Sequence, residues 1–201
     1  MNEEKQSLGA IDTETIVKAT TELLYAIGED PKREGLKETP NRVARTYLNE
    51  LCCGYQQEGE IDKLITKFGS EKYNQMILCR DIEFYSLCEH HMLPFYGRCH
   101  IAYIPGKSLL GISKLSRLVE VYARRLQVQE RLTNQIASCI EERIQPQGVM
   151  VVMEGIHLCM RMRGVKQHNS VMTTSALKGV FMSEPHAKAE FFSLLRSGCE
   201  F

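Results

Sequence analysis

The sequence carries no net charge at neutral pH, because 25 lysine and arginine residues balance 25 aspartate and glutamate residues. It therefore lacks the basic surface that typically binds nucleic acid, and it also lacks the H-x-E and P-C-x-x-C pattern of nucleic-acid deaminases. No apolar run is long enough to span a bilayer. The first residues lack the apolar segment of a signal peptide, so we expect a cytoplasmic protein with no membrane partner. Any anionic ligand must be bound by a local group of basic residues.

A chain of 201 residues suits one domain with a helical addition, and we find no internal repeat or low-complexity tract. Eight cysteines are present, and without an export signal we expect them to be reduced thiols rather than disulfides. Six lie at scattered positions and are expected to be small packing or surface residues. Cys88 and Cys159 differ from these six because each lies close to histidine.

Apolar periodicity predicts helices over residues 13–28, from residue 39 onward and over 61–68, with a loop over 54–59. Strands are predicted over 76–85, 97–104, 149–159 and 170–181, a divided helical region over 113–146, and a last helix over 185–195. This order predicts an α+β fold with a four-stranded antiparallel sheet and helices on one face. We divide the chain into an N-terminal helical region, residues 1–70, and a catalytic domain, residues 71–201. The open edges of so small a sheet favour side-by-side assembly.

One short stretch places Cys88, His90 and His91 within four consecutive positions. Cysteine and histidine are the usual ligands of zinc, and a catalytic zinc site commonly has three protein ligands and one water, which the ion activates. Cys88, His91 and the distant Cys159 would form such a Cys2His site. His90 and His157 lie next to ligands but diverge from them, which leaves them free to exchange protons. The alternative is a closed structural zinc site without chemistry.

Basic residues flank these candidate ligands along the sequence. Lys114 and Arg117 lie one turn apart at the start of the long helical region, where a helix N-terminus favours anions. Arg163 follows Cys159 in a basic link. As a set, these residues indicate a phosphorylated substrate. Glu130 lies in a first helical turn, where it would either complement the helix dipole or accept two hydrogens from a guanine-like edge.

These stretches together resemble the zinc-dependent GTP cyclohydrolase I family from about Thr13 to Arg196. The motifs that carry the resemblance are residues 33–36 (REGL), 39–44 (TPNRVA), 88–91 (CEHH), 94–97 (PFYG), 111–115 (GISKL), 127–132 (QVQERL), 157–159 (HLC) and 163–164 (RG). Their order is that of the family. The resemblance implies zinc ligation by Cys88, His91 and Cys159, and acid–base roles for His90 and His157.

The resemblance also implies the substrate contacts. Glu130, with Gln129 beside it, is expected to hold the guanine edge, and Ser113 is expected to assist the rearrangement of the sugar. The triphosphate is expected to contact four basic side chains, those of Lys114, Arg117, Arg163 and, from a neighbouring subunit, Arg42.

The implied reaction is hydrolysis of the purine imidazole ring of GTP, with release of formate and formation of 7,8-dihydroneopterin triphosphate. This is the first step of tetrahydrofolate or tetrahydrobiopterin biosynthesis. The implied fold is the tunnelling fold, in which sheets join edge to edge in a decamer of two pentamers with sites between subunits. Two alternatives remain open at this point: another pterin or deazapurine enzyme of the same fold, and a non-catalytic module that zinc stabilises.

Overall fold

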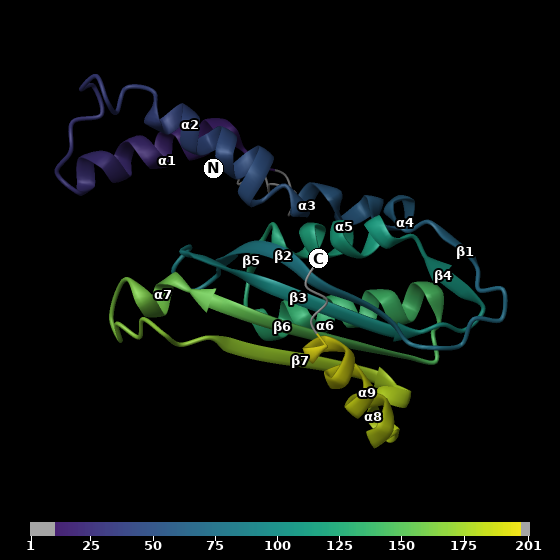
Figure 1. Cartoon of the computed structure of the whole chain (residues 1–201). Coiled ribbons are helices and arrows are strands. Elements are labelled where there is room, and N and C mark those ends of the chain that lie inside the picture. Colours follow the sequence, from purple (N-terminus) through teal and green to yellow (C-terminus); the bar gives the residue numbers. More distant parts are fainter. Residues whose placement is uncertain (1–10, 198–201) are drawn as a thin grey trace, which may run out of the picture.

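The main sheet contains five strands in the order β5-β2-β3-β6-β7 in the computed structural model, which describes residues 11–197 (Figure 1). Its antiparallel strands are β2 (Ile77–Cys88), β3 (Pro94–Ile104), β6 (Gly148–His157) and β7 (Met172–Gly179). The short β5 (Leu126–Gln127) pairs with β2 in parallel. A separate two-stranded sheet joins β1 (Lys67–Gly69) to β4 (Ser108–Leu110).

The α+β class and the four antiparallel strands are confirmed, but the predicted count of four strands is wrong. Two residues form the fifth strand, β5, which adds to the free edge of β2 where β2 ends. A strand of two residues shows no apolar alternation, so the sequence pattern could not reveal it. The described helices follow in the order α1 (Thr13–Ala26), α2 (Thr39–Thr46), α3 (Gly54–Gln57), α4 (Ile61–Leu64), α5 (Ile112–Ala123), α6 (Gln129–Ile144), α7 (Leu158–Arg161), α8 (Val180–Ser183) and α9 (Pro185–Arg196), with a π-helical turn at Tyr47–Leu51 and a 3-10 turn at Glu58–Glu60.

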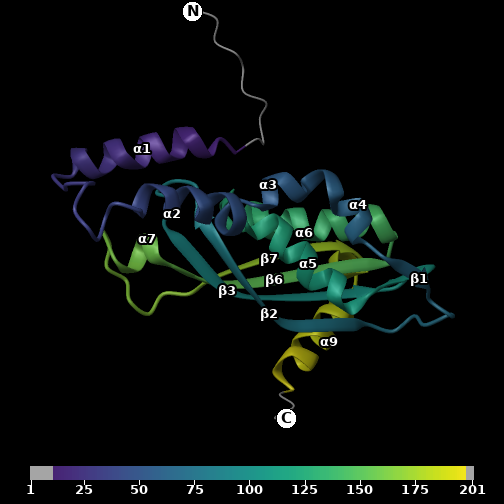
Figure 2. The same ribbon diagram turned by 90° about the horizontal axis from the view of Figure 1, so that it is seen from above.

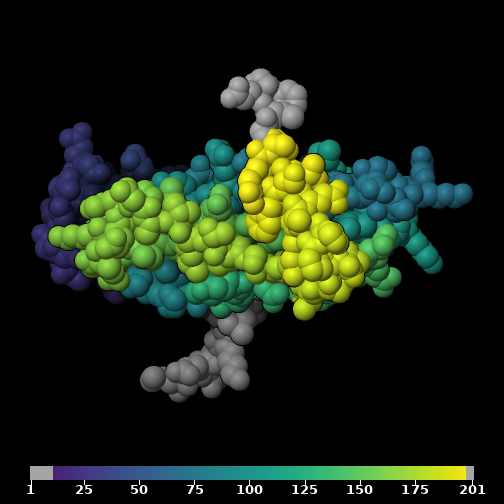
Figure 3. Space-filling model, turned by 60° about the horizontal axis from the view of Figure 1, so that its bottom comes forward, coloured from purple at the N-terminus to yellow at the C-terminus, as the bar shows by residue number. Residues whose placement is uncertain are grey.

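Helices cover both faces of the main sheet, which corrects the expectation of helices on one face. Helices α5 and α6 pack on the face that carries Cys99, Ile101 and Tyr103 of β3, and these residues belong to the larger core. On the opposite face, Met150 and Val152 of β6 form a second, smaller core together with apolar side chains of α8 and α9, among them Phe181 and Phe191. Figure 3 shows this C-terminal segment (yellow) standing out from one face of the molecule.

Helices α3 and α4 pack on α5, and α1 and α2 extend beyond them to one side (Figure 2). Helix α1 packs on α2, and the Asp12 side chain caps α1 by accepting from the Thr15 amide at 3.0 Å. Residues 54–59 are helical, so the predicted loop is wrong. The reason is tertiary: the Gly54 amide donates to the Arg124 carbonyl at 3.1 Å, and a Cβ at Gly54 would lie 2.2 Å from the Val121 carbonyl oxygen. Ile61 of α4 is buried in the larger core.

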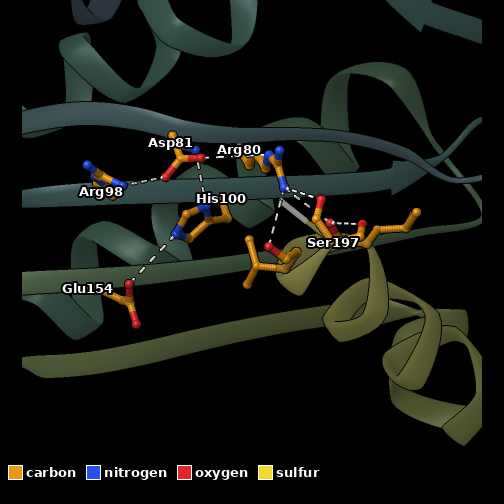
Figure 4. A network of polar contacts seen from close by, with 8 residues as sticks. Arg80, Asp81, Arg98, His100, Glu154 and Ser197 are labelled. Carbon is orange, nitrogen blue, oxygen red and sulfur yellow. Dashed lines mark hydrogen bonds and ion pairs between the residues drawn. The ribbon is translucent and has the colours of Figure 1, made fainter. Parts of the chain in front are cut away.

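A bulge in β2 anchors the C-terminal helix to the sheet (Figure 4). The register shifts between Cys79 and Ile82, and Asp81 adopts a φ of 60°. The amide of Asp81 donates to Nδ1 of the buried His100 at 3.1 Å. The Arg80 guanidinium donates to three carbonyls at the end of α9, those of Leu194, Leu195 and Ser197, at 3.0 to 3.4 Å. Cationic donors at a helix C-terminus satisfy carbonyls that lack helical partners.

Protonation of His100 is expected to destabilise the fold. Burial lowers the pKa of His100; the Arg98 and Arg80 charges act in the same direction, and the Asp81 and Glu154 carboxylates oppose them. The folded chain therefore favours the neutral ring. The contribution of His100 to the free energy of unfolding is complete above about pH 6.5, and it is lost as the pH falls below that value. His100→Asn keeps an acceptor for the Asp81 amide but cannot titrate. We expect the free energy of unfolding, measured in urea at about pH 7.5 and 5.5, to decline less in this variant than in wild type.

The matched control is His186→Asn, because His186 is exposed on α9. This variant should show the wild-type decline. An equal decline in His100→Asn and wild type would contradict the assignment of His100 as an acid-sensitive group.

Candidate metal centre and active site

Three distant segments place two thiols and one imidazole within metal-binding reach. Cys88 is the last residue of β2, His91 lies in the turn before β3, and Cys159 lies in α7, directly after β6. Their ligand atoms all lie within 4.8 Å of one another. The register of β3 and β6, which pairs Phe95 with His157, brings the end of β6 beside the β2–β3 turn. Zinc binds thiolate sulfur at about 2.3 Å and imidazole nitrogen at about 2.0–2.1 Å, so this donor set fits a zinc ion with small side-chain adjustments.

The Cys159 thiol is affected by its burial and by two neighbours, Cys88 and Arg163. Burial raises the pKa of the Cys159 thiol, and the Cys88 sulfur beside it raises this pKa further, whereas the Arg163 charge acts in the opposite direction. Arg163 is held close to the cluster, because its Nε donates to the Cys159 carbonyl at 3.1 Å. The structure thus places Arg163, one of the predicted substrate contacts, beside the candidate ligands.

The turn that carries Cys88 and His91 is fixed by backbone bonds and by β5. The Cys88 amide donates to the Leu93 carbonyl at 2.9 Å, and the Met92 amide donates to the Cys88 carbonyl at 2.7 Å. The Glu89 amide donates to the Gln127 carbonyl of β5 at 3.1 Å. These bonds hold the ligand loop rigidly at the end of β2.

A polar chain continues from this turn into α6. The Glu89 carboxylate forms an ion pair with Arg131, whose Nε donates to Oε1 of the buried Gln127 at 3.0 Å. Neither Arg131 nor Gln127 was predicted to have a role. Their spacing of four residues could have indicated that the two side chains contact each other. Only the structure reveals that Arg131 also pairs with Glu89.

The two histidines expected to exchange protons each lie within two residues of a candidate ligand in the sequence and differ in their surroundings. His90 is exposed, and its Nδ1 lies 3.8 Å from the Cys88 sulfur. His157 is half-buried and stacks on Phe95, with ring centroids 4.5 Å apart and an interplanar angle of 6°. Burial lowers the pKa of His157, and the nearby Glu130 carboxylate opposes this shift. Phe95 belongs to a quoted motif, but sequence reasoning assigned it no function.

Gln129 and Glu130 occupy the first turn of α6 but face different surroundings. Glu130 is exposed. Gln129 is buried, and its carboxamide contacts protein atoms at both ends, including His157. Beside them, a pocket of ≈ 310 Å³ is lined by Gly155, His157, Met160, Ser170, Val171 and Met172. The prediction that Glu130 and Gln129 bind a guanine edge stays a prediction.

Three predicted residues lie away from the metal-type cluster within one chain. Ser113, Lys114 and Arg117 occupy the start of α5, where the Gly111 amide donates to the Thr66 carbonyl and the Leu110 amide donates to the Tyr103 hydroxyl. Tyr103 pairs with Ile77 at the beginning of β2. Within one chain, the start of α5 therefore lies toward the opposite end of β2 from Cys88, and the predicted substrate contacts of these three residues stay predictions.

The end of α5 lies at the other end of β2. There, the Leu87 amide donates to the Arg125 carbonyl, and Cys88 pairs with Gln127. About ten residues at ~1.5 Å each separate Ser113 from this end, which is about 15 Å along the helix axis. Arg42 is exposed on α2, in the N-terminal helical region.

Taken alone, the site defines a candidate metal-dependent enzyme, since a three-ligand donor set leaves a position for water, the His90 imidazole lies 3.8 Å from one ligand sulfur, and His157 lies two residues before another ligand. The family model of GTP cyclohydrolase I matches residues 16–196. Two curated relatives named GTP cyclohydrolase 1, from Deinococcus radiodurans and Leptospira biflexa serovar Patoc, are each 54% identical to the chain. The alignments cover 88% of this chain in both cases, and 81% and 96% of the respective relatives.

A relative of the same name from Campylobacter jejuni is also 54% identical, over 87% of this chain and 91% of its own length. The chain therefore belongs to the GTP cyclohydrolase I family, and it is an enzyme of this type. A solved structure of an archaeosine synthase QueF-Like in the apo form matches with a TM-score of 0.44 and 16% identity, covering 52% of this chain and 93% of its own. Among residues 11–197, no helix combines the length and apolarity needed to cross a membrane.

Proposed function

We propose that this chain binds zinc through Cys88, His91 and Cys159 and hydrolyses the imidazole ring of GTP, with release of formate and formation of 7,8-dihydroneopterin triphosphate. The observation that carries the proposal is the convergence of two thiols and one imidazole, with ligand atoms within 4.8 Å, in a chain of the GTP cyclohydrolase I family. Zinc in such a site supplies an activated water for attack at C8 of the purine. The product would enter tetrahydrofolate or tetrahydrobiopterin biosynthesis.

The chain's own groups have distinct tasks in this proposal. His90 and His157 transfer protons to and from the nitrogens of the opening ring, and imidazole is suited to this near neutral pH. The Glu130 carboxylate accepts hydrogens from the guanine edge. Glu130 is exposed, and it lies in the same first turn of α6 as Gln129. Arg163 binds the triphosphate close to Cys159.

The remaining predicted residues act from neighbouring subunits. Ser113, Lys114 and Arg117 lie in the first half of α5, whose start is at the opposite end of β2 from Cys88, and this placement favours their contribution to a site on another chain. In the described part of the chain, β7 forms one edge of the main sheet, and most of β2 is free beside the short β5 at the other. We propose that such edges join in a tunnelling-fold assembly, a decamer of two pentamers. There, Lys114, Arg117 and Ser113 of one chain, and Arg42 of another, complete each site.

The test is incubation of the purified full-length protein with GTP, with three measurements: zinc content, formate released, and dihydropterin fluorescence. Wild type should contain zinc and yield formate and a fluorescent product in equal amounts. His90→Ser should retain the zinc and lose formate release. Loss of zinc in this variant would show that His90, rather than His91, is the ligand.

The same experiment separates the two alternative functions. A non-catalytic module that zinc stabilises would contain the metal but would neither bind nor convert GTP. A pterin or deazapurine enzyme of the same fold would release no formate from GTP. Either result would overturn the proposal.

A further inference from the structure

We infer that Gln129 is a positioning residue that fixes His157 in one tautomer and one orientation, and that Nδ1 of His157 is the atom that exchanges protons with the substrate. This inference rests on the proposed function for the role of His157. It gives Gln129 a task different from direct contact with guanine.

The hydrogen bonds of Gln129 determine which way its carboxamide faces. Its Nε2 lies 3.1 Å from the Met153 carbonyl oxygen, 2.9 Å from that of Met172 and 3.1 Å from the Thr174 hydroxyl. Carbonyl oxygens only accept hydrogen bonds, so the NH2 end of the carboxamide must face β6 and β7. The residue is 1% exposed, so rotation of the amide would leave buried donors and acceptors unpaired.

With its direction fixed, the carboxamide also fixes the proton of His157. Gln129 Oε1 lies 2.9 Å from His157 Nε2. Because an amide oxygen can only accept, Nε2 must carry the hydrogen, and in the neutral ring Nδ1 then carries the lone pair. Nε2 is occupied by this bond, which leaves Nδ1 as the ring nitrogen available to a substrate.

Two further contacts show that the ring and the carboxamide are held together as a unit. Phe95 stacks on the imidazole at 4.5 Å. A Cβ at Gly155 would lie 2.2 Å from Gln129 Oε1 and 3.1 Å from its Cδ, so the absence of a side chain at this position creates the space for the carboxamide. Glycine at 155 is therefore a requirement of the Gln129–His157 bond.

The support of Gln129 extends into a hydroxyl pair that does not reach His157. Thr133 Oγ1 donates to the backbone carbonyl of Gln129 at 2.6 Å and lies 2.6 Å from Thr174 Oγ1. Thr133 is buried. It thus provides a matched control: its loss disturbs the same cluster without removing the bond to the imidazole.

The first measurement needs no variant. Solid-state NMR of the zinc-loaded protein labelled with 15N-histidine should show His157 as the Nε2–H tautomer, with its signals identified by their absence from His157→Asn. Detection of the Nδ1–H tautomer would overturn the inference. The result does not depend on turnover of GTP, so failure of the proposed function and failure of this inference are distinguishable.

The second measurement is kinetic and uses two variants that break the bond in different ways. Gln129→Met removes the acceptor, and Gly155→Ala displaces it. Both should lower kcat for formate release roughly 10- to 100-fold, as loss of an orienting partner does, while KM for GTP changes by less than about twofold and zinc content stays constant. Both should also show mixed His157 tautomers.

Thr133→Val should lose stability but keep kcat and the tautomer. A raised KM with unchanged kcat in Gln129→Met would overturn the inference in favour of direct contact with guanine. An unchanged kcat together with an unchanged tautomer in Gly155→Ala would overturn it as well.

Discussion

Replacement of Cys159 by serine is expected to remove bound zinc and to lower formate release from GTP by roughly a thousandfold or more, since the step depends on the metal. Cys159 provides one of the two sulfur ligands, and its partner atoms on Cys88 and His91 lie within 4.8 Å. A serine hydroxyl does not ionise near neutral pH, so it cannot replace a thiolate ligand of zinc. With two ligands left, the ion would dissociate into any chelating buffer.

The measurement is zinc content by mass spectrometry alongside formate and dihydropterin produced by the same sample. Cys53→Ser is the matched control, because Cys53 is also half-buried but lies outside the cluster. Its sulfur contacts the Glu50 carbonyl at 3.6 Å, a bond that serine can keep. A Cys159→Ser protein with full zinc and full turnover would refute the ligand assignment.

The sequence was sufficient to identify the family and the candidate ligands, which are two thiols and one imidazole, because these residues lie in uninterrupted motifs. It could not determine how they meet. Convergence depends on the register that pairs Phe95 of β3 with His157 of β6, and apolar alternation along one strand does not specify its partner in another. The structure confirms that Cys88, His91 and Cys159 converge, while the roles of the other candidates stay predictions.

The fold was mispredicted where tertiary contacts outweigh local pattern. The run Val149–Met153 of β6 is apolar at every position, and all five residues are buried, alternately in the larger and the smaller core. Unbroken apolar runs are typical of strands covered on both faces. This pattern was the available signal that the C-terminal helices lie opposite α5 and α6. The role of Gln129 had no such signal, since its partners are backbone carbonyls of β6 and β7.

Two inactive variants are expected to restore activity to each other when they assemble together. One chain carries His90→Ser, and the other carries Lys114→Ala with Arg117→Ala. Each alone should be almost inactive, because every site then lacks either a proton-transfer group or its triphosphate contacts. In the structure these two groups lie at opposite ends of β2. If sites form between chains, a mixed assembly contains some sites built from the intact half of each variant.

The expected recovery follows from random assembly. With equal amounts of the two chains, the metal side is intact in about one half of sites and the α5 side in about one half, so about one quarter of sites should be complete. Co-expression with two different tags, purification through both, and assay of formate release measures this fraction. A mixture of His90→Ser with Cys159→Ser is the control: both changes lie on the metal side of one chain, so no complete site can form and no activity should return. Equal inactivity of both mixtures would show that one chain supplies every group of its own site, and α5 would then have to lie elsewhere in the working enzyme.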